Sequence, residues 1–238
     1  MQPRLAPYWW EDMVPLGSAR RRALQRTLGL GLRPVLVASM SRSGSTLLHK
    51  SVVTAWAERR FGRHAGRMRP FIDEAAWRLD ETPLVGGVVY KTHDLPDGLP
   101  RETRPRVLFT YRRASDVAIS IVGCSERFGP KWFKKMRSNL RGHGELGELL
   151  EADTFGLGLQ VDEWSKAEGV DVLGLRYESL WSRAAEIEAF LGFPVTLPPR
   201  RSSPKHAPPD PALTEKLRAT YAELDRRIEA MPDMFVRS

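Results

Sequence analysis

One stretch of the chain, residues 34–50, constrains the fold more than any other. It reads Pro-Val-Leu-Val-Ala-Ser-Met-Ser-Arg-Ser-Gly-Ser-Thr-Leu-Leu-His-Lys, which predicts an apolar strand, a short polar loop and then a helix. Small loop residues let the backbone close on a ligand, and the unpaired N–H groups that begin a helix carry partial positive charge. The stretch predicts a phosphate cradle, with an ordinary turn before a capped helix as the alternative. The cradle residues are Arg42, Ser43, Gly44, Ser45 and Thr46.

This loop differs from the loop that binds nucleoside triphosphates. The latter has the pattern Gly-x-x-x-x-Gly-Lys-Ser/Thr, in which the lysine contacts the outer phosphates and the hydroxyl binds magnesium. Here residues 38–43 contain no glycine, and Ser45 stands where the lysine belongs. The sequence favours a phosphorylated ligand and argues against hydrolysis of ATP or GTP. A kinase with an atypical loop stays open as an alternative, and it would need magnesium and an acidic residue to hold it.

Two further predicted strands end in charged residues. One ends with Lys91 and His93, and the other ends with Arg112. In open α/β sheets, ligands bind at the carboxyl ends of the strands. A helical pattern follows Arg112 and brings Ser120 about two turns further along, so we expect both side chains to face one ligand.

Four stretches in this order resemble the sulfotransferase family that uses 3′-phosphoadenosine 5′-phosphosulfate (PAPS). They are similar to its 5′-phosphosulfate loop, the segment with its catalytic histidine, its 3′-phosphate motif, and its Tyr-Glu-x-Leu strand end with the helix that follows. Their residues are Arg42–Leu48, Lys91–His93, Tyr111–Ser120, and Leu175–Leu180 followed by Phe190–Gly192. The resemblance covers about residues 34–193. It implies a P-loop-like fold and PAPS as the cofactor.

The resemblance also implies which residues hold the donor. The cradle would hold the 5′-phosphate, and Arg112 with Ser120 would hold the 3′-phosphate. Tyr177 would lie near the adenine. Many relatives close over the 3′-phosphate with a late Arg-Lys-Gly segment, whereas this chain has the proline-rich stretch 198–206. Its candidates for that role are Arg200, Arg201 and Lys205, with a solvated connector as the alternative.

Three residues carry the chemistry that the resemblance implies. His93 would be the general base that takes a proton from the acceptor hydroxyl or amine, which then attacks sulfur in line with the departing phosphate. Arg42 and Lys91 would stabilise the charge on that phosphate. The commonest relatives have lysine in place of Arg42, so we expect its help to be purely electrostatic. No metal is expected. A carboxylate is the alternative base, and the candidates are Asp94, Asp73 and Glu74.

The predicted elements alternate between strand and helix, which is typical of a parallel sheet covered by helices on both faces. Strands are predicted over residues 34–40, 86–92, 106–111 and 171–176. Helices are predicted over residues 46–60, 73–80, 114–126, 145–168, 182–191 and 211–230, the last with Asp210 and Pro211 as cap and first position. A chain of 238 residues suits a single α/β domain. We expect an extension at 1–33, a basic proline-rich loop at 196–211 and a C-terminal helix at 211–230.

The chain has a net charge of +8. Its arginines are spread through predicted helices and loops and do not form one lysine-rich arm. An anionic cofactor would account for part of this charge, and residues on solvent-exposed faces would account for most of the rest. We therefore expect no nucleic-acid partner. A non-catalytic module that binds nucleic acid stays open as the alternative.

Cysteine content and hydropathy bear on location. With Cys124 as the single cysteine, no intrachain disulfide can form. No apolar run approaches the roughly 18 residues of a membrane span, and the first residues lack the basic start and apolar core of a signal peptide. We therefore expect a cytoplasmic location.

Aromatic residues between the motifs predict the acceptor site. They lie in residues 61–84 and 125–141, and they are Phe61, Phe71, Trp77, Phe128, Trp132 and Phe133. Such side chains bind apolar or ring-bearing small molecules, although packing in the core is the alternative for each. The basic cluster from Lys131 to Arg137 fits either an acidic acceptor or a solvated helix face. Neither the acceptor nor the oligomeric state follows from the sequence.

Overall fold

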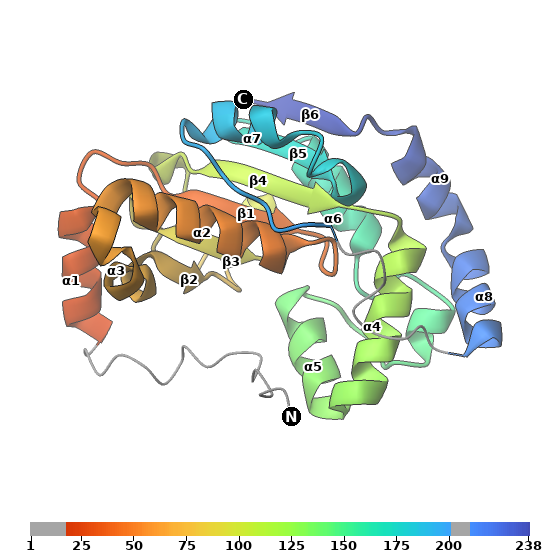
Figure 1. Cartoon of the computed structure of the whole chain (residues 1–238). Coiled ribbons are helices and arrows are strands. Elements are labelled where there is room, and N and C mark those ends of the chain that lie inside the picture. The colour runs from red at the N-terminus through yellow and green to blue at the C-terminus, as the bar shows by residue number, and fades with distance from the viewer. Residues whose placement is uncertain (1–17, 201–209) are drawn as a thin grey trace.

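A computed structural model describes residues 18–200 and 210–238 of the chain. In these residues a six-stranded sheet runs in the order β2-β3-β1-β4-β5-β6 (Figure 1). Its first five strands are parallel, and β6 pairs with β5 in the antiparallel direction. The strands are β1 Val35–Ser39, β2 Asp73–Ala75, β3 Val89–Thr92, β4 Arg106–Tyr111, β5 Asp171–Arg176 and β6 Met234–Arg237.

The central strands form because their apolar runs are buried on both faces, as parallel strands require. All five residues of β1 are buried. Successive side chains alternate between faces, so Val35 and Val37 join one apolar cluster while Leu36 and Ala38 join the other. The fold is therefore the α/β sandwich that the sequence predicts.

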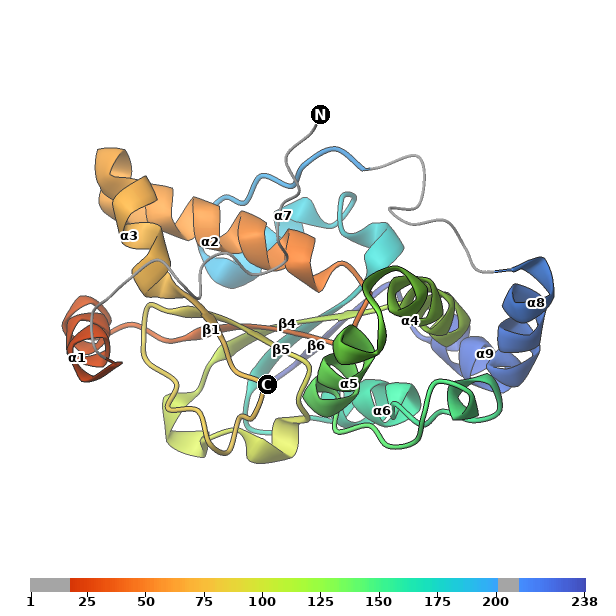
Figure 2. The same cartoon turned by 90° about the horizontal axis from the view of Figure 1, so that it is seen from below.

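Helices cover both faces of the sheet (Figure 2). Helices α2 and α7 share one apolar cluster with the sheet, and α4, α6, α8 and α9 share the other. The bounds are α1 Ser18–Leu28, α2 Ser45–Phe61, α3 Ala65–Ile72, α4 Ala114–Phe128, α5 Pro130–Asn139, α6 Leu157–Ser165, α7 Ala184–Leu191, α8 Pro211–Thr220 and α9 Ala222–Ala230.

The four predicted strands and most of the predicted helices are confirmed, and the differences have local causes. The helix predicted over 73–80 is wrong, because residues 73–75 instead pair with β3 as the edge strand β2. Within 145–168 the structure has the short 3₁₀ helix Glu148–Leu150 and then α6, because Gly156 adopts a left-handed conformation before α6. The predicted C-terminal helix is interrupted at Tyr221, between α8 and α9. Asp210 caps α8 as expected, its carboxylate accepting from the Ala212 N–H at 2.7 Å.

Besides β2, the α-helices and strands that were not predicted from the sequence are α1, α3, α5 and β6. Helix α1 lies within the predicted extension at 1–33 and packs beside the sheet edge, where the Gln25 side chain donates to Glu74 at 2.8 Å. The remaining part of that extension, residues 1–17, lies outside the described residues.

The strand order brings three carboxyl ends together at one edge of the sheet. Strand β1 lies between β3 and β4. The chain leaves β1 toward β2 and leaves β4 toward β5, so the two connections run in opposite directions. Ligands bind in open α/β sheets where connections diverge in this way.

Candidate functional site

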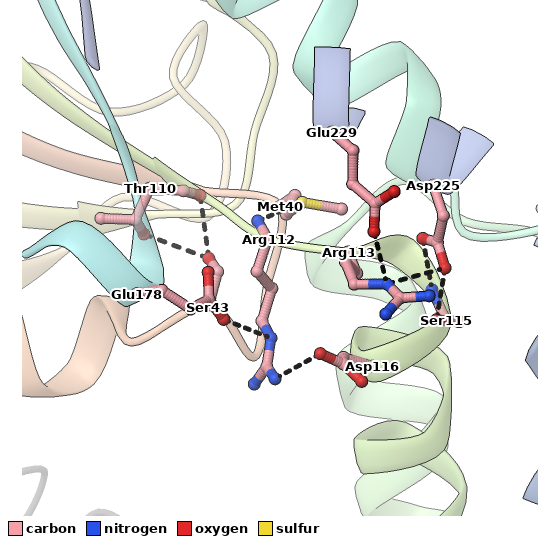
Figure 3. Close-up of polar contacts among 10 residues, drawn as sticks. All are labelled: Met40, Ser43, Thr110, Arg112, Arg113, Ser115, Asp116, Glu178, Asp225 and Glu229. Atoms are coloured by element: carbon pink, nitrogen blue, oxygen red, sulfur yellow. Dashed lines mark hydrogen bonds and ion pairs between the residues drawn. The ribbon is translucent and has the colours of Figure 1, made fainter. Parts of the chain in front are cut away.

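The loop after β1 adopts an unusual backbone conformation. Ser41 and Arg42 have φ of 67° and 45°, and Gly44 has φ of 85°. The hydroxyl of Ser43 donates to the Thr110 carbonyl at 2.8 Å, which fastens the loop to the end of β4 (Figure 3). Because this fully buried hydroxyl already has a partner, Ser43 offers a ligand mainly its backbone N–H.

Gly44 is required at its position for two reasons. Its φ lies in the left-handed region, which costs other residues energy. A Cβ on Gly44 would also lie 2.5 Å from Cδ2 of Tyr177, so the Tyr177 ring packs against the bare backbone. Helix α2 starts at the next residue, and the N–H groups of its first turn have no acceptor within the helix. The loop and helix start therefore form an anion cradle with Tyr177 as one wall.

Arg42 joins the two predicted phosphate sites. Its Nε donates to the hydroxyl of Ser120 at 2.9 Å, across 78 residues of sequence. Ser120 lies on α4, which starts after β4, whereas Arg42 belongs to the loop after β1. The side chain predicted to bind the 3′-phosphate therefore faces the predicted 5′-phosphate cradle.

Arg112 lies beside the same cradle. One of its terminal nitrogens donates to Asp116 at 2.7 Å, and its Nε lies 3.9 Å from a Glu178 oxygen (Figure 3). Its guanidinium lies 5.2 Å from the Tyr177 ring centroid, which places it next to the wall of the cradle. The Nε is buried and lacks a hydrogen-bond acceptor among the described residues. Among the described residues only the bond to Asp116 uses one of the five N–H donors of this guanidinium, so Arg112 keeps donors, Nε among them, for an anion.

Lys91 reaches the cradle from the end of β3. Its ammonium donates to the Thr46 hydroxyl at 2.7 Å and lies 5.9 Å from the Trp77 ring centroid. Burial, together with the positive charges of Arg42 and Lys50, lowers the pKa of Lys91 from 10.5 to about 8. An anion bound in the cradle would favour the charged form of this lysine.

His93 is buried at the same sheet edge with its ring held in one orientation. Nδ1 lies 2.9 Å from the hydroxyl of Ser39 and 3.1 Å from its carbonyl oxygen. Since a carbonyl only accepts, Nδ1 carries the proton and Nε2 keeps its lone pair. Burial, and then the charge of Lys91, lower the pKa of His93 to about 3, so the ring is neutral. The indole of Trp77 stacks on it, with the ring centroids 5.4 Å apart.

The candidate carboxylate bases are engaged elsewhere. Asp94 is fully buried and accepts from the Leu79 N–H at 2.8 Å and from Arg141 at 2.9 Å. Glu74 pairs with Arg21 at 2.9 Å beside α1. Asp73 lies 3.6 Å from the buried His49, and burial raises the pKa of its carboxyl. Of these candidates, His93 is the one whose ring stacks on Trp77, the same indole that lies 5.9 Å from the Lys91 ammonium beside the cradle.

The predicted clamp is only partly described. Arg200 stacks over the Trp181 ring at 5.7 Å, and Trp181 in turn meets the Tyr177 ring at 5.6 Å. A row of side chains thus connects Arg200 to the wall of the cradle. Arg201 and Lys205 lie outside the described residues.

Several contributors to the site were missed in the sequence. Ser39 orients His93 and Thr110 holds the loop, but both hydroxyls sit in apolar strands and look structural. Gln160 donates to the His93 carbonyl at 2.6 Å from α6, and no motif marks it. Of the predicted acceptor-site aromatics, Trp77 lies at the candidate base, whereas Phe133 is buried in the core.

The described residues contain neither a candidate metal centre nor a candidate membrane span. No group of three or more histidine, cysteine, aspartate or glutamate side chains in residues 18–200 and 210–238 is arranged to hold a metal ion. Within the same ranges, every helix is too short or too polar to span a bilayer.

Comparison with known proteins gave structural neighbours only. No family model and no curated protein matches the sequence. A mouse sulfotransferase, SULT7A1, complexed with PAP is 16% identical with a TM-score of 0.41, over 85% of this chain and 69% of that one. Retinol dehydratase in complex with androsterone and the inactive cofactor PAP is 17% identical with a TM-score of 0.39, over 87% of this chain and 69% of that one.

Proposed function

We propose that this chain transfers the sulfuryl group of PAPS to a hydroxyl or amine of a small-molecule acceptor. The observation that carries the proposal is the bond between Arg42 and Ser120, because it joins a cradle after β1 to a second cationic site after β4. A ligand that fills both must carry two separate anionic groups. PAPS has a 5′-phosphosulfate and a 3′-phosphate.

The two anionic groups of PAPS fit the hydrogen-bond donors that surround the cradle. Backbone N–H groups at the start of α2 and the Thr46 hydroxyl would bind the 5′-phosphate, and the unused Nε of Arg112 would bind the 3′-phosphate with Ser120. The Tyr177 ring offers a face for the adenine. In this proposal the 3′-phosphate displaces Arg42 from Ser120 and leaves it free to face the sulfuryl group.

The reaction would proceed by in-line displacement at sulfur. The acceptor oxygen or nitrogen forms a bond to sulfur while the bond between sulfur and the bridging phosphate oxygen breaks. His93 Nε2 takes the acceptor's proton, and adenosine 3′,5′-bisphosphate (PAP) leaves with the electron pair. Lys91 and Arg42 stabilise the charge that develops on the leaving phosphate.

The low pKa of His93 shapes this mechanism. A base with a pKa of about 3 is neutral as required but accepts a proton poorly. Part of that lowering comes from the charges of Lys91 and Arg42, which the anionic donor would offset. We therefore expect donor binding to raise the basicity of His93 before transfer.

The test uses the purified full chain with labelled PAPS and a panel of phenols, alcohols and amines, each assayed with and without EDTA. Sulfated product and an equal amount of PAP are expected in both conditions. Product that requires magnesium and ATP would instead support the kinase alternative. His93→Asn should lower turnover by about 10²- to 10⁴-fold while leaving PAP affinity unchanged, whereas the control His143→Asn should change neither. Full turnover by the His93 variant would move the role of base to a carboxylate.

Arg42 can be tested separately from the base. Arg42→Lys keeps the charge and loses the planar fork that bonds Ser120. If Arg42 stabilises the leaving phosphate by charge alone, and this charge must be held in position by the planar guanidinium, turnover of the variant should fall while its PAP affinity changes little. Unchanged turnover would show that the fork geometry is irrelevant.

A further inference from the structure

The positive charge of the chain is concentrated at one end of the fold. Residues 18–30 and 58–69 together contain nine arginines and a single acidic residue, Glu58, which gives a charge of +8. The whole chain also carries +8, so all the other residues sum to zero. These two segments therefore carry a charge equal to that of the whole chain, whereas the basic cluster from Lys131 to Arg137 is balanced by acidic residues elsewhere in the sequence.

The fold brings the two segments together. Arg21 of α1 donates to the Pro70 carbonyl, and Gln25 donates to the Phe71 carbonyl at 3.0 Å, which fastens α1 to the end of α3. Figures 1 and 2 both show α1, α3 and the C-terminal end of α2 at the end of the molecule opposite α4 and α5. Helix α2 has 17 residues and begins at the cradle, so this end lies about 25 Å from the candidate site. A ligand in the cradle cannot account for its charge.

Six of these arginines form an exposed set, which we call the arginine surface. They are Arg20, Arg22, Arg26, Arg59, Arg63 and Arg67. None of the six pairs with a carboxylate in the described part of the chain. Unpaired guanidinium groups at this density repel one another, and an anionic partner would relieve that repulsion.

We infer that the arginine surface docks onto the headgroups of an anionic lipid bilayer. Leu30, in the turn that follows α1, is 78% exposed and provides an apolar group near the arginines of α1. The aromatic rings near this surface are engaged within the fold. Trp56 donates to the Gly87 carbonyl and packs on Phe193. The guanidinium of Arg60 lies over the rings of both Trp56 and Phe61. Among the described residues at this end, the rings of Trp56 and Phe61 are thus occupied and do not offer a face to nucleic-acid bases, so charge plus Leu30 favours lipid over nucleic acid.

The experiment measures sedimentation of the full chain with vesicles of phosphatidylcholine alone or with 30% phosphatidylserine. Binding to the anionic vesicles is expected, with loss in 0.5 M salt. The variant Arg20→Gln/Arg22→Gln/Arg26→Gln should bind about 100-fold more weakly, because each basic residue near an anionic surface contributes roughly fivefold. The matched control Lys134→Gln/Lys166→Gln/Lys216→Gln removes the same charge from exposed positions elsewhere and should bind as the original chain does.

Each remaining outcome decides the inference. Leu30→Ser should weaken vesicle binding roughly tenfold if the side chain enters the bilayer. Equal loss in the control variant, or equal binding to neutral and anionic vesicles, would overturn the proposal. So would failure to bind vesicles together with tight binding of a labelled 20-nucleotide strand, since that result assigns the surface to nucleic acid. PAP affinity of the α1 variant should be unchanged, which separates this inference from the proposed function.

Discussion

Lys91 makes PAP binding depend on pH in a way that can be calculated from the structure. In the free protein its pKa is lowered from 10.5 to about 8 by burial and by the charges of Arg42 and Lys50. If the phosphate of bound PAP restores the pKa toward 10.5, binding takes up a proton at any pH between the two values. This difference between the two pKa values corresponds to about 3 kcal/mol of binding free energy, since one pKa unit is about 1.4 kcal/mol.

The sign and size of the effect follow from linkage. The complex favours protonated Lys91, so affinity is full below about pH 8 and is lost as the pH rises above it. With pKa values of about 8 free and 10.5 bound, affinity falls about 20-fold between pH 7.5 and 9.5. The phosphates of PAP are fully ionised throughout this window because their pKa is about 6.

Isothermal titration calorimetry of PAP at several pH values measures this dependence. Buffers with different heats of ionisation count the protons taken up, and about one is expected at pH 9.5. Lys91→Met should bind weakly at every pH with no slope, whereas the exposed control Lys216→Met should keep the slope. A flat affinity for the original chain, or the same slope in Lys91→Met, would refute the placement of Lys91 against the phosphate.

Three other perturbations give separate tests. Gly44→Ala should lower the free energy of unfolding by about 1–3 kcal/mol and PAP affinity at least about tenfold. The reason is that φ is +85° and that Cδ2 of Tyr177 lies 2.5 Å from the new Cβ. An unaltered PAP affinity would count against the cradle. The pKa of His93 is lowered in the free protein, so from pH 7.5 down to 6 kcat/KM for PAPS should fall only by the about twofold that protonation of the 3′-phosphate costs, where a histidine of ordinary pKa would lose about fourfold more; the larger loss would contradict the lowered pKa. Asp225→Ala should cost about 2 kcal/mol in urea unfolding, since the buried carboxylate accepts from the N–H and hydroxyl of Ser115 (Figure 3); an unchanged midpoint would contradict this.

The parts of the fold that could be predicted are those whose signal is local. An apolar run such as Val35–Ala38 is buried on both faces wherever it is placed in a parallel sheet. Likewise the small loop before α2 is recognisable because glycine is the residue that adopts a φ such as the 85° of Gly44 without strain. The prediction that the site lies at the carboxyl edge of the sheet depends only on strand direction. In the structure Lys91, His93 and Arg112 lie at that edge.

The elements that were missed depend on partners distant in sequence. The segment Asp73–Ala75 contains two acidic residues and lacks a strand pattern, yet it pairs with β3 because that strand otherwise has a free edge. Strand β6 forms at the opposite edge, where a Cβ on Gly174 would lie 2.1 Å from the Phe235 ring. Such pairings cannot be predicted without knowing which edges remain open.

The environment of the candidate base was also beyond the sequence. The ladder pairs Ala38 with Thr92, so the next residues along each strand, Ser39 and His93, come side by side from 54 positions apart. The motif located His93, but its burial and its neighbour Lys91 set a pKa of about 3 that no motif encodes. If His93 is the base, its strength would therefore depend on the charge of the bound donor, which the sequence motif does not reveal.

The clustering of charge is also hard to predict from the sequence, because it depends on which residues the fold brings close together in space. Along the chain the arginines look scattered, with about 30 residues between the group on α1 and the group at the end of α2 and in α3. The bonds from Arg21 and Gln25 to the end of α3 bring both groups to one end of the molecule, where they carry the entire net charge. Because the other residues sum to zero, the candidate site owes its positive potential to a few placed side chains, Arg42, Lys91 and Arg112, and not to the overall charge. Vesicle binding and PAP binding should therefore respond to different substitutions, and a variant that changed both would imply that the two surfaces are coupled.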